Sequence, residues 1–402
     1  MSQPTNEPAH RPATATSGAD GDTLRVTLLA QGEQSALDIA RQLARFIAAA
    51  RQSLDLAIYD FRLSGQPAEL VAAALRERAA AGVAIRIAYD ADKPSHPHPL
   101  RGMDPAPSGT GAFVGALGHP ARRIGGLKLM HHKYLVRDAA LPSAAVWTGS
   151  ANFTLDSWTL QENNILEISS AALAGAYARD FAELWRRGDI AETGDFVPHT
   201  SEAVFAGAPA TIHAHFAPGC GAAINDEVAR LVAGARRRVL ICSMLLNAGP
   251  LIGALRDLAR AGQVAVSGVY DRTQMLGVLE QWQSVPHNHW KIGALAEIVA
   301  RAGLVGKHST PFTPNSPHDF LHCKTLVVDD MVITGSYNFS NSAELNAENI
   351  LMIESAALAE TYSRFIAHLA RKYAGGPQGL SLPANADSGT EDGGTSYGGP
   401  SA

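Results

Sequence analysis

The same pattern of histidine, lysine and aspartate stands twice in this sequence, at identical spacing. Its members are His131, Lys133 and Asp138, then His322, Lys324 and Asp329. Each histidine lies two residues before its lysine in a run typical of a β-strand, so both side chains should point to one face. A lysine ammonium can neutralise phosphate oxygens while an imidazole attacks phosphorus or transfers protons. Two such copies facing each other would supply one histidine for each side of an in-line displacement at phosphorus.

A second motif, Gly-Ser-x-Asn-Phe, follows each of these patterns. Its serines and asparagines are Ser150, Asn152, Ser336 and Asn338. The asparagine amides can donate hydrogen bonds to phosphate oxygens, as the donors of an oxyanion hole do, and we expect the serines to support the site. A Glu-Asn pair comes 13 residues after the glycine of each copy, at Glu162 and Glu348. A carboxylate behind an imidazole fixes its tautomer and raises its basicity, which is the role we expect for both glutamates.

These motifs belong to an internal duplication of the chain. Residues 50–61 align with 235–246, and residues 74–92 align with 254–273 with one extra residue in the second copy. Each half has the pattern of a strand, a helix, a strand, the histidine-containing strand, two further strands and a helix. We therefore expect an α/β protein made of two pseudo-twofold related α/β/α sandwich domains.

The duplication and the polar ends of the chain set the expected domain boundaries. Both ends are polar and low in complexity, which is typical of disordered tails. We expect a tail at residues 1–22, a first half at 23–200, a second half at 201–374 and a tail at 375–402.

The combined motifs resemble those of the phospholipase D superfamily: H-x-K-x4-D, then G-S-x-N-F, then E-N. Both copies match in full, and the resemblance covers nearly all of the chain between the tails. It implies phospholipase D-type halves with one active site at their interface, no metal or other cofactor, and a covalent phosphohistidine intermediate. It also implies His131 as the nucleophile and His322 as the acid and base, although the near symmetry of the sequence allows the reverse. Asp138 and Asp329 would hold structure and would not touch phosphate.

The composition is that of a soluble globular protein, with 46% hydrophobic and 18% charged residues. Lys and Arg number 33 against 38 Asp and Glu, and this net charge of −5 disfavours a nucleic-acid partner. Three cysteines are too few for a disulfide framework or a zinc cluster. The first residues lack the pattern of a secretory signal and no run approaches about 18 apolar residues. We therefore expect no transmembrane segment and a cytoplasmic location.

Long loops are expected before each histidine motif. One contains His96 and His98, and the others contain residues 287–290 and 310–320. Binding residues concentrate on loops over a rigid scaffold, so these loops should shape the substrate cleft, with Trp290 available to a lipid or a base. A basic cluster is open to two interpretations, a solvated surface or a patch that attracts an anionic substrate: Arg122, Arg123 and Lys128.

A phospholipid is the preferred substrate, hydrolysed at its head-group ester, with a peripheral membrane surface as a partner. The acidic balance favours it, as do apolar residues expected in the cleft loops: Phe113, Val114, Leu117, Met275, Leu276, Leu279, Phe312 and Phe320. The alternatives are an endonuclease acting on nucleic-acid phosphodiesters, a phosphatidyltransferase similar to cardiolipin synthases, and a module that binds anionic lipid without catalysis. The balance between hydrolysis and transfer to alcohols stays open.

Overall fold

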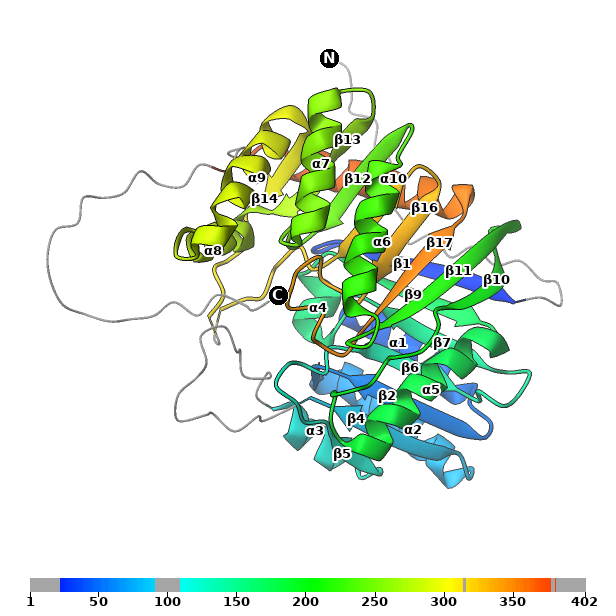
Figure 1. Cartoon of the computed structure of the whole chain (residues 1–402). Coiled ribbons are helices and arrows are strands. Elements are labelled where there is room, and N and C mark those ends of the chain that lie inside the picture. The colour runs from blue at the N-terminus through cyan, green and yellow to red at the C-terminus, as the bar shows by residue number, and fades with distance from the viewer. Residues whose placement is uncertain (1–21, 91–108, 314–315, 377–379, 381–402) are drawn as a thin grey trace, which may run out of the picture.

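A computed structural model of the chain describes residues 22–90, 109–313, 316–376 and Leu380. Its described strands form one sheet of 15 strands and one of two strands, and helices cover both faces of the large sheet (Figure 1). The spatial order in the large sheet is β14-β13-β12-β15-β16-β17-β11-β10-β1-β9-β7-β6-β2-β4-β5. The two-stranded sheet pairs β3 with β8.

The first half of the chain contributes the last seven strands of that spatial order, β1-β9-β7-β6-β2-β4-β5. Its elements, in chain order, are β1 (Thr23–Leu29), α1 (Ala36–Ala48), β2 (Ser53–Ile58), β3 (Phe61–Arg62), α2 (Gly65–Ala80), β4 (Ala84–Tyr89), α3 (Thr110–Leu117), β5 (Ala121–Arg123), β6 (Lys133–Arg137), β7 (Ala145–Gly149), β8 (Phe153–Thr154), α4 (Leu155–Thr159), β9 (Asn163–Ser169) and α5 (Ala171–Arg187).

The second half repeats most of this order, with β11 in the place of β1. Its described elements include no counterpart of β3, β8 or α4, and α8, η1 and α9 stand where the first half has α3. Its elements are β10 (His199–Phe205), β11 (Ala208–Ala217), α6 (Gly221–Ala233), β12 (Arg238–Ser243), α7 (Gly249–Ala261), β13 (Ala265–Asp271), α8 (Arg272–Gln283), the 3-10 helix η1 (Pro286–Asn288), α9 (His289–Arg301), β14 (Gly303–Lys307), β15 (Lys324–Val328), β16 (Met331–Gly335), β17 (Glu348–Glu354) and α10 (Ala356–Tyr373). Strand β10 joins the halves because it pairs antiparallel with β11 and parallel with β1.

A serine caps the N-terminus of the helix that closes each half. The hydroxyls of Ser170, before α5, and Ser355, before α10, accept the N–H groups of Leu173 and Leu358. Such caps satisfy backbone donors that the first turn of a helix leaves free. Helix α5 ends at Gly188, whose φ of 68° is the left-handed conformation that glycine adopts without strain.

The two halves share one apolar core between them. The cluster that joins them includes Tyr134 and Tyr177 of the first half and Leu321 and Leu351 of the second. Strands β6 and β15 lie in the middle of their half-sheets, and nearly all their residues are buried. The motif lysines are the first residues of these strands, and the motif histidines, expected within the strands, lie two residues before them.

The structure confirms the α/β class and the two repeated halves, and corrects two interpretations of loops. Trp290 lies in the first turn of α9, not in a loop. The apolar residues assigned to the cleft are helical up to residue 279: Phe113, Val114 and Leu117 belong to α3, and Met275, Leu276 and Leu279 to α8. In α8 the buried residues Met275, Leu279 and Trp282 recur at helical spacing, which directs them into the core. His96 and His98 lie outside the described residues.

Candidate active site

A buried aspartate anchors the residue before each motif histidine. Asp90, after β4, accepts the N–H of Met130 at 2.9 Å, and Asp271, at the end of β13, accepts that of Leu321 at 2.9 Å. Asp271 also accepts hydrogen bonds from two neighbouring groups, while burial raises its pKa to about 6. The chain therefore enters both histidine strands in the same way.

The histidine of the first half is held by a carboxylate of the second. Nδ1 of His131 lies 2.8 Å from each carboxylate oxygen of Glu348. Ser336 donates to this carboxylate at 2.6 Å and Asn346 at 3.2 Å, while the N–H of His131 donates to the carbonyl of Ala347 at 2.8 Å. Burial raises the pKa of Glu348 to about 7. The carboxylate fixes the ring through Nδ1, so we expect Nε2 to be the nitrogen that does the chemistry.

The histidine of the second half is held by an amide of the first. Nδ1 of His322 lies 3.2 Å from Oδ1 of Asn163. The amide nitrogen of Asn163 donates to two oxygens of Ser157 and to Gln161, each at 3.1 Å, and Ser150 donates to Oδ1 at 2.7 Å. These contacts fix the amide orientation, so Oδ1 accepts and Nδ1 of His322 carries the proton. In the neutral ring the lone pair is then on Nε2.

Glu162, expected behind His322, lies elsewhere in the structure. Its carboxylate is 2.5 Å from Nζ of the buried Lys307. It also accepts the hydroxyl of Tyr373 and, at 3.1 Å, the N–H of Gln31. Glu162 therefore forms a buried ion pair with Lys307 and does not support His322, whose partner is Asn163.

Strand register explains this correction. Gly149 pairs with Ile165 across β7 and β9, whereas Gly335 pairs with Ile350 across β16 and β17. The first copy thus holds one more residue between glycine and isoleucine. The residue two positions before each isoleucine contacts Nδ1 of a motif histidine. This residue is Asn163 in the first half and Glu348 in the second. Counting residues along the sequence did not detect the extra residue because both counts reached a Glu-Asn pair.

Both motif lysines are buried and anchored to their own strands. Lys133 Nζ donates to the carbonyl of His131 at 2.6 Å, and Lys324 Nζ to that of His322 at 2.7 Å. Burial lowers the pKa of Lys133 well below its ordinary value and that of Lys324 to about 7. An ammonium has three N–H groups, so each lysine keeps donors for a phosphate.

The two histidines and two lysines form one electrostatic cluster. Burial lowers the pKa of both His131 and His322 well below the usual range, and the charges of Lys133 and Lys324 lower both further. The pairs lie in different halves of the chain, and the contacts of each histidine with the opposite half place them at one interface. Such a site favours neutral imidazoles in the absence of an anion and attracts an anion to the lysines.

The two motif asparagines contribute buried amides. Oδ1 of Asn152 and Oδ1 of Asn338 are both buried without a hydrogen-bond partner. Buried polar atoms in folded proteins are normally paired, so this capacity suits a ligand rather than the fold. The side-chain amide can present either its oxygen or its nitrogen to that ligand.

Tyr59 is a site residue that the motifs did not predict. Its ring packs edge-on against the His131 ring at 4.7 Å between centroids, and Lys133 Nζ lies 4.9 Å from its centre. The repeat aligns Tyr59 with Met244, so the corresponding position in the other half is not aromatic. The alignment could have identified the position, but nothing in it indicates contact with the histidine.

The motif aspartates bind backbone. Asp138 accepts N–H groups of residues 51–53 at 2.7–3.1 Å, and Asp329 those of residues 236–238 at 2.8–3.1 Å. Their φ angles of 52° and 54° are left-handed, a conformation that Asp tolerates better than most residues. These contacts agree with the structural role that the family resemblance implies.

Two neighbouring groups are structural. His132, which immediately precedes β6, is buried with Nδ1 3.3 Å from Asn349, and burial lowers its pKa to about 3. Arg122 of the basic cluster donates to the carbonyls of Trp185 and Arg186, which caps the end of α5.

Among the described residues, no group of three or more His, Cys, Asp or Glu side chains is arranged to hold a metal ion.

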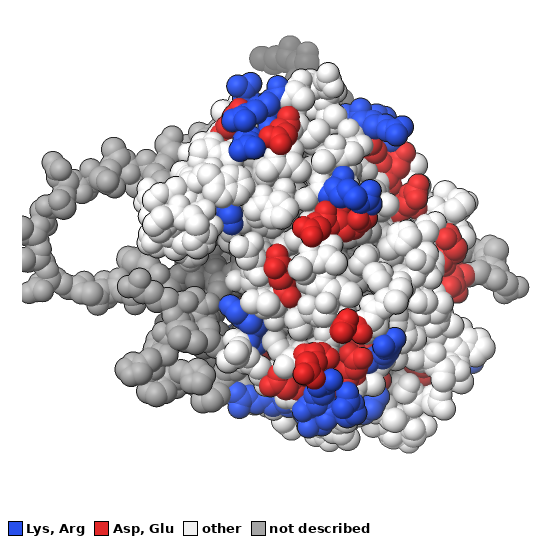
Figure 2. All heavy atoms as spheres, viewed as in Figure 1, with Lys and Arg blue, Asp and Glu red and all other residues white. Residues whose placement is uncertain are grey.

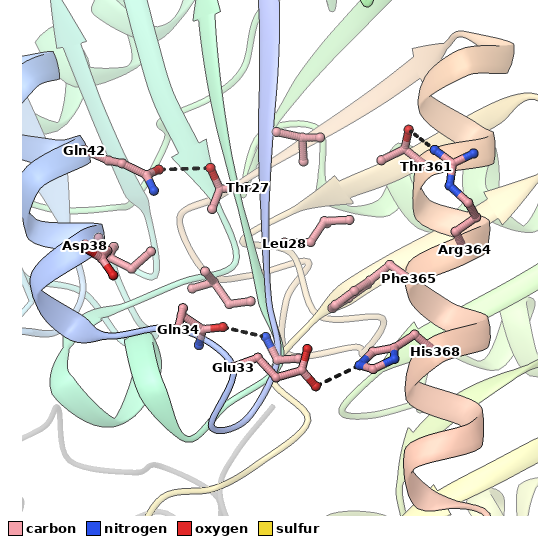
Figure 3. Close-up of a pocket in the computed structure, with 14 residues that line it drawn as sticks. Thr27, Leu28, Glu33, Gln34, Asp38, Gln42, Thr361, Arg364, Phe365 and His368 are labelled. Atoms are coloured by element: carbon pink, nitrogen blue, oxygen red, sulfur yellow. Dashed lines mark hydrogen bonds and ion pairs between the residues drawn. The ribbon is translucent and has the colours of Figure 1, made fainter. Parts of the chain in front are cut away.

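A separate pocket of about 220 Å³ lies between α1, β1 and α10 (Figure 3). It is lined in part by Leu28, Phe365 and Glu33, and Glu33 is held by His368 and Lys372 at 2.8 and 2.9 Å. None of the motif residues lines this pocket. The residues suited to chemistry lie in the histidine–lysine cluster and not in this pocket, so that cluster is the candidate active site.

Comparison with known proteins identifies the family. The family profile described as "Cardiolipin synthase, PLD-like domain" matches residues 43–185 and again residues 228–370. The chain belongs to the phospholipase D superfamily. This membership assigns it to a superfamily of phosphodiester chemistry. No curated protein matches the chain by sequence.

Solved structures share this phospholipase D fold. Phosphatidylserine synthase from Haemophilus influenzae Rd KW20 is 14% identical with a TM-score of 0.58, over 87% of this chain and 86% of its own. Polyphosphate kinase from Porphyromonas gingivalis is 12% identical with a TM-score of 0.53, over 87% and 47%. At these identities the likeness concerns the fold alone. None of the described helices is long and apolar enough to cross a membrane.

Proposed function

We propose that this phospholipase D superfamily protein hydrolyses the head-group ester of a phospholipid through a covalent phosphohistidine, without a metal. The observation that carries the proposal is the reciprocal support of the two histidines. Each imidazole is bound at Nδ1 by a residue of the opposite half, and each has a lysine of its own half beside it. One site thus holds two imidazoles with Nε2 available, as a two-step displacement at phosphorus requires.

The unequal groups behind the histidines support different roles for them. Attack through Nε2 puts positive charge on the nucleophile's ring, and the Glu348 carboxylate stabilises that charge at His131. The amide of Asn163 keeps His322 in the same tautomer without a counter-charge, so its imidazolium is the stronger acid. We therefore assign His131 as the nucleophile and His322 as the acid and base.

In the first step, Nε2 of His131 bonds to phosphorus while the bond from phosphorus to the head-group oxygen breaks. His322 gives that oxygen its Nε2 proton; the bound phosphodiester anion favours the protonated imidazole. In the second step, His322 takes a proton from water, whose oxygen attacks phosphorus and breaks the nitrogen–phosphorus bond. The lysines neutralise the non-bridging oxygens, and the amides of Asn152 and Asn338 donate hydrogen bonds to them. The products are phosphatidic acid and the free head group.

Charge supports a phospholipid over a nucleic acid. The net charge of −5 opposes the phosphate contacts on which nucleic-acid affinity depends. Over the described residues of the face in Figure 2, Lys and Arg are mixed with Asp and Glu, without a continuous basic stripe. A nuclease of this superfamily would favour such a stripe.

Phosphatidyl transfer is a second candidate, favoured by the description of the matching family profile. In this reaction an alcohol takes the place of water in the second step. His322 would then remove the proton of the alcohol, and the product would be a new phosphodiester. Both candidates use the same residues, so only the acceptor distinguishes them.

The test is to incubate the purified protein in EDTA with phosphatidylcholine vesicles and, separately, with single-stranded DNA. We expect choline release by the native protein and none by His131→Ala, with DNA intact. Addition of glycerol then separates the candidates, because a transferase would form phosphatidylglycerol. Cut DNA with intact lipid would overturn the substrate, and loss of all activity in EDTA would overturn the metal-free mechanism.

A further inference from the structure

Large apolar side chains are exposed at few places in the described part of the chain. There are four: Leu127 at 74%, Val197 at 86%, Trp290 at 46% and Leu345 at 54% exposure. Single exposed apolar residues are common on protein surfaces, whereas a group of them around a site indicates an interaction surface. All except Val197 lie on segments bound to the residues that carry the candidate active site.

The two leucines belong to a pair of hydrogen-bonded segments. The N–H of Leu129 donates to Oδ1 of Asn346 at 3.0 Å, and the N–H of Ala347 donates to the carbonyl of Leu129 at 2.8 Å. Leu127 lies two residues before Leu129, and Leu345 lies next to Asn346. The same segments continue directly into the nucleophilic histidine and its carboxylate. Any surface that covers these leucines therefore lies beside the reacting groups.

Trp290 stands on a third segment that is tied to the site. The adjacent Lys291 donates to the carbonyl of Asn247 at 3.1 Å, and Asn247 donates its N–H to Phe339, which follows a motif asparagine, at 2.8 Å. Burial lowers the pKa of Lys291, and the carboxylate of Glu344, next to an exposed leucine, opposes this shift. Through Asn247, the tryptophan segment is thus tied to Phe339, the last residue of the second Gly-Ser-x-Asn-Phe motif. Over α8, which packs against α9, Figure 2 shows a surface with few charged residues.

We propose that Leu127, Trp290 and Leu345 form a docking surface that inserts into the interface of a phospholipid bilayer. This inference rests on the proposed function. A stably bound protein on this surface would block the approach to the histidines, whereas a bilayer supplies the substrate itself. A leucine next to a lysine, as Leu127 is next to Lys128, and an exposed tryptophan suit the boundary between acyl chains and anionic head groups.

The test measures binding to vesicles of phosphatidylcholine and phosphatidylglycerol by sedimentation, in the His131→Ala background so that the lipid stays intact. We expect Leu127→Ser and Leu345→Ser each to weaken binding about tenfold. Val197→Ser, an exposed apolar residue on the linker between the halves, is the matched control and should bind normally. Brominated lipids should quench the fluorescence of Trp290, and Trp290→Phe should lose that quenching. Normal binding by the double leucine variant would overturn the proposal.

Turnover separates this surface from the proposed function. With His131 present, the double leucine variant should hydrolyse a short-chain phosphatidylcholine below its micellar concentration at the native rate, but vesicles much more slowly. Native protein that binds vesicles through the leucines yet hydrolyses neither lipid would overturn the function and support the surface. Native protein that hydrolyses the short-chain lipid without binding vesicles would overturn the surface alone.

Discussion

Glu348 of the second half holds the imidazole of His131 of the first half, with both carboxylate oxygens 2.8 Å from Nδ1. The reverse contact, from the first half to His322, is made by the amide of Asn163 at 3.2 Å. The pseudo-twofold site is therefore chemically unequal at this pair of equivalent positions. A nucleophile and an acid need different stabilisation, so we interpret this inequality as the origin of the division of roles.

Substitution of Glu348 and Asn163, the two residues that contact Nδ1 of the histidines, tests that division. Glu348→Gln removes the counter-charge of the nucleophile, and we expect kcat to fall about 10- to 100-fold. Asn163→Asp keeps an acceptor for Nδ1 of His322, so we expect a fall of less than about tenfold. Steady-state turnover checks both, with Glu354→Gln, an exposed carboxylate on the same strand as Glu348, as the control. A fully active Glu348→Gln variant would contradict the role of the pair.

The pH dependence should be bell-shaped, with a maximum of kcat/KM near pH 7. Burial raises the pKa of Glu348 to about 7 and lowers that of Lys324 to about 7. The active form has Glu348 ionised and Lys324 protonated. Below the maximum Glu348 gains a proton, and above it Lys324 loses one, so the rate falls on both sides.

Variants assign the two limbs of this profile, because interacting groups titrate as a pair. Lys324→Arg keeps its charge at higher pH and should move the alkaline limb upward. Glu348→Gln should remove the acid limb. A profile that is flat between about pH 5 and 9 would exclude both assignments.

Asp138 should affect stability more than chemistry. Asp138→Ala leaves the N–H groups of residues 51–53 without their acceptor, and we expect the free energy of unfolding to fall by about 3 kcal/mol. Asp138→Asn retains one acceptor and tolerates the left-handed φ, so its loss should be about 1 kcal/mol. Urea unfolding at pH 7 measures both, and turnover per folded molecule should be unchanged.

The advantage of native protein over Asp138→Asn should depend on pH. Its backbone hydrogen bonds lower the pKa of Asp138 below the ordinary 3.8, although burial opposes them. The stabilisation is then fully present above about pH 4 and is lost as pH falls through the lowered pKa. An advantage that grows toward acid pH would contradict this account of the aspartate.

Sequence patterns predicted the parts of the site that recur at fixed spacing. The duplication predicted the two-half α/β fold, and contacts between the halves place the motif histidines at one interface. The partner of His322 could not be obtained in this way. Glu162 and Asn163 are neighbours, and only the pairing of β7 with β9 decides which of them faces the site.

Contacts between distant segments were also beyond the sequence. Lys307, which pairs with Glu162, lies 145 residues away from it and has no counterpart motif in the first half. Tyr59, which follows β2, packs against a histidine far away in the sequence, and Trp290 was expected in a loop but lies in the first turn of α9. These positions follow from tertiary packing, which local spacing does not encode.

The most direct test of the central claim is to trap the phosphohistidine. The His322→Ala variant lacks the base for the second step, so with a p-nitrophenyl phosphodiester, whose leaving group needs no proton, the intermediate should accumulate. Mass spectrometry after an alkaline quench should find one phosphoryl adduct, on the peptide containing His131, and none in the double variant His131→Ala/His322→Ala. Release of p-nitrophenol by the single variant without any histidine adduct would contradict covalent catalysis by His131.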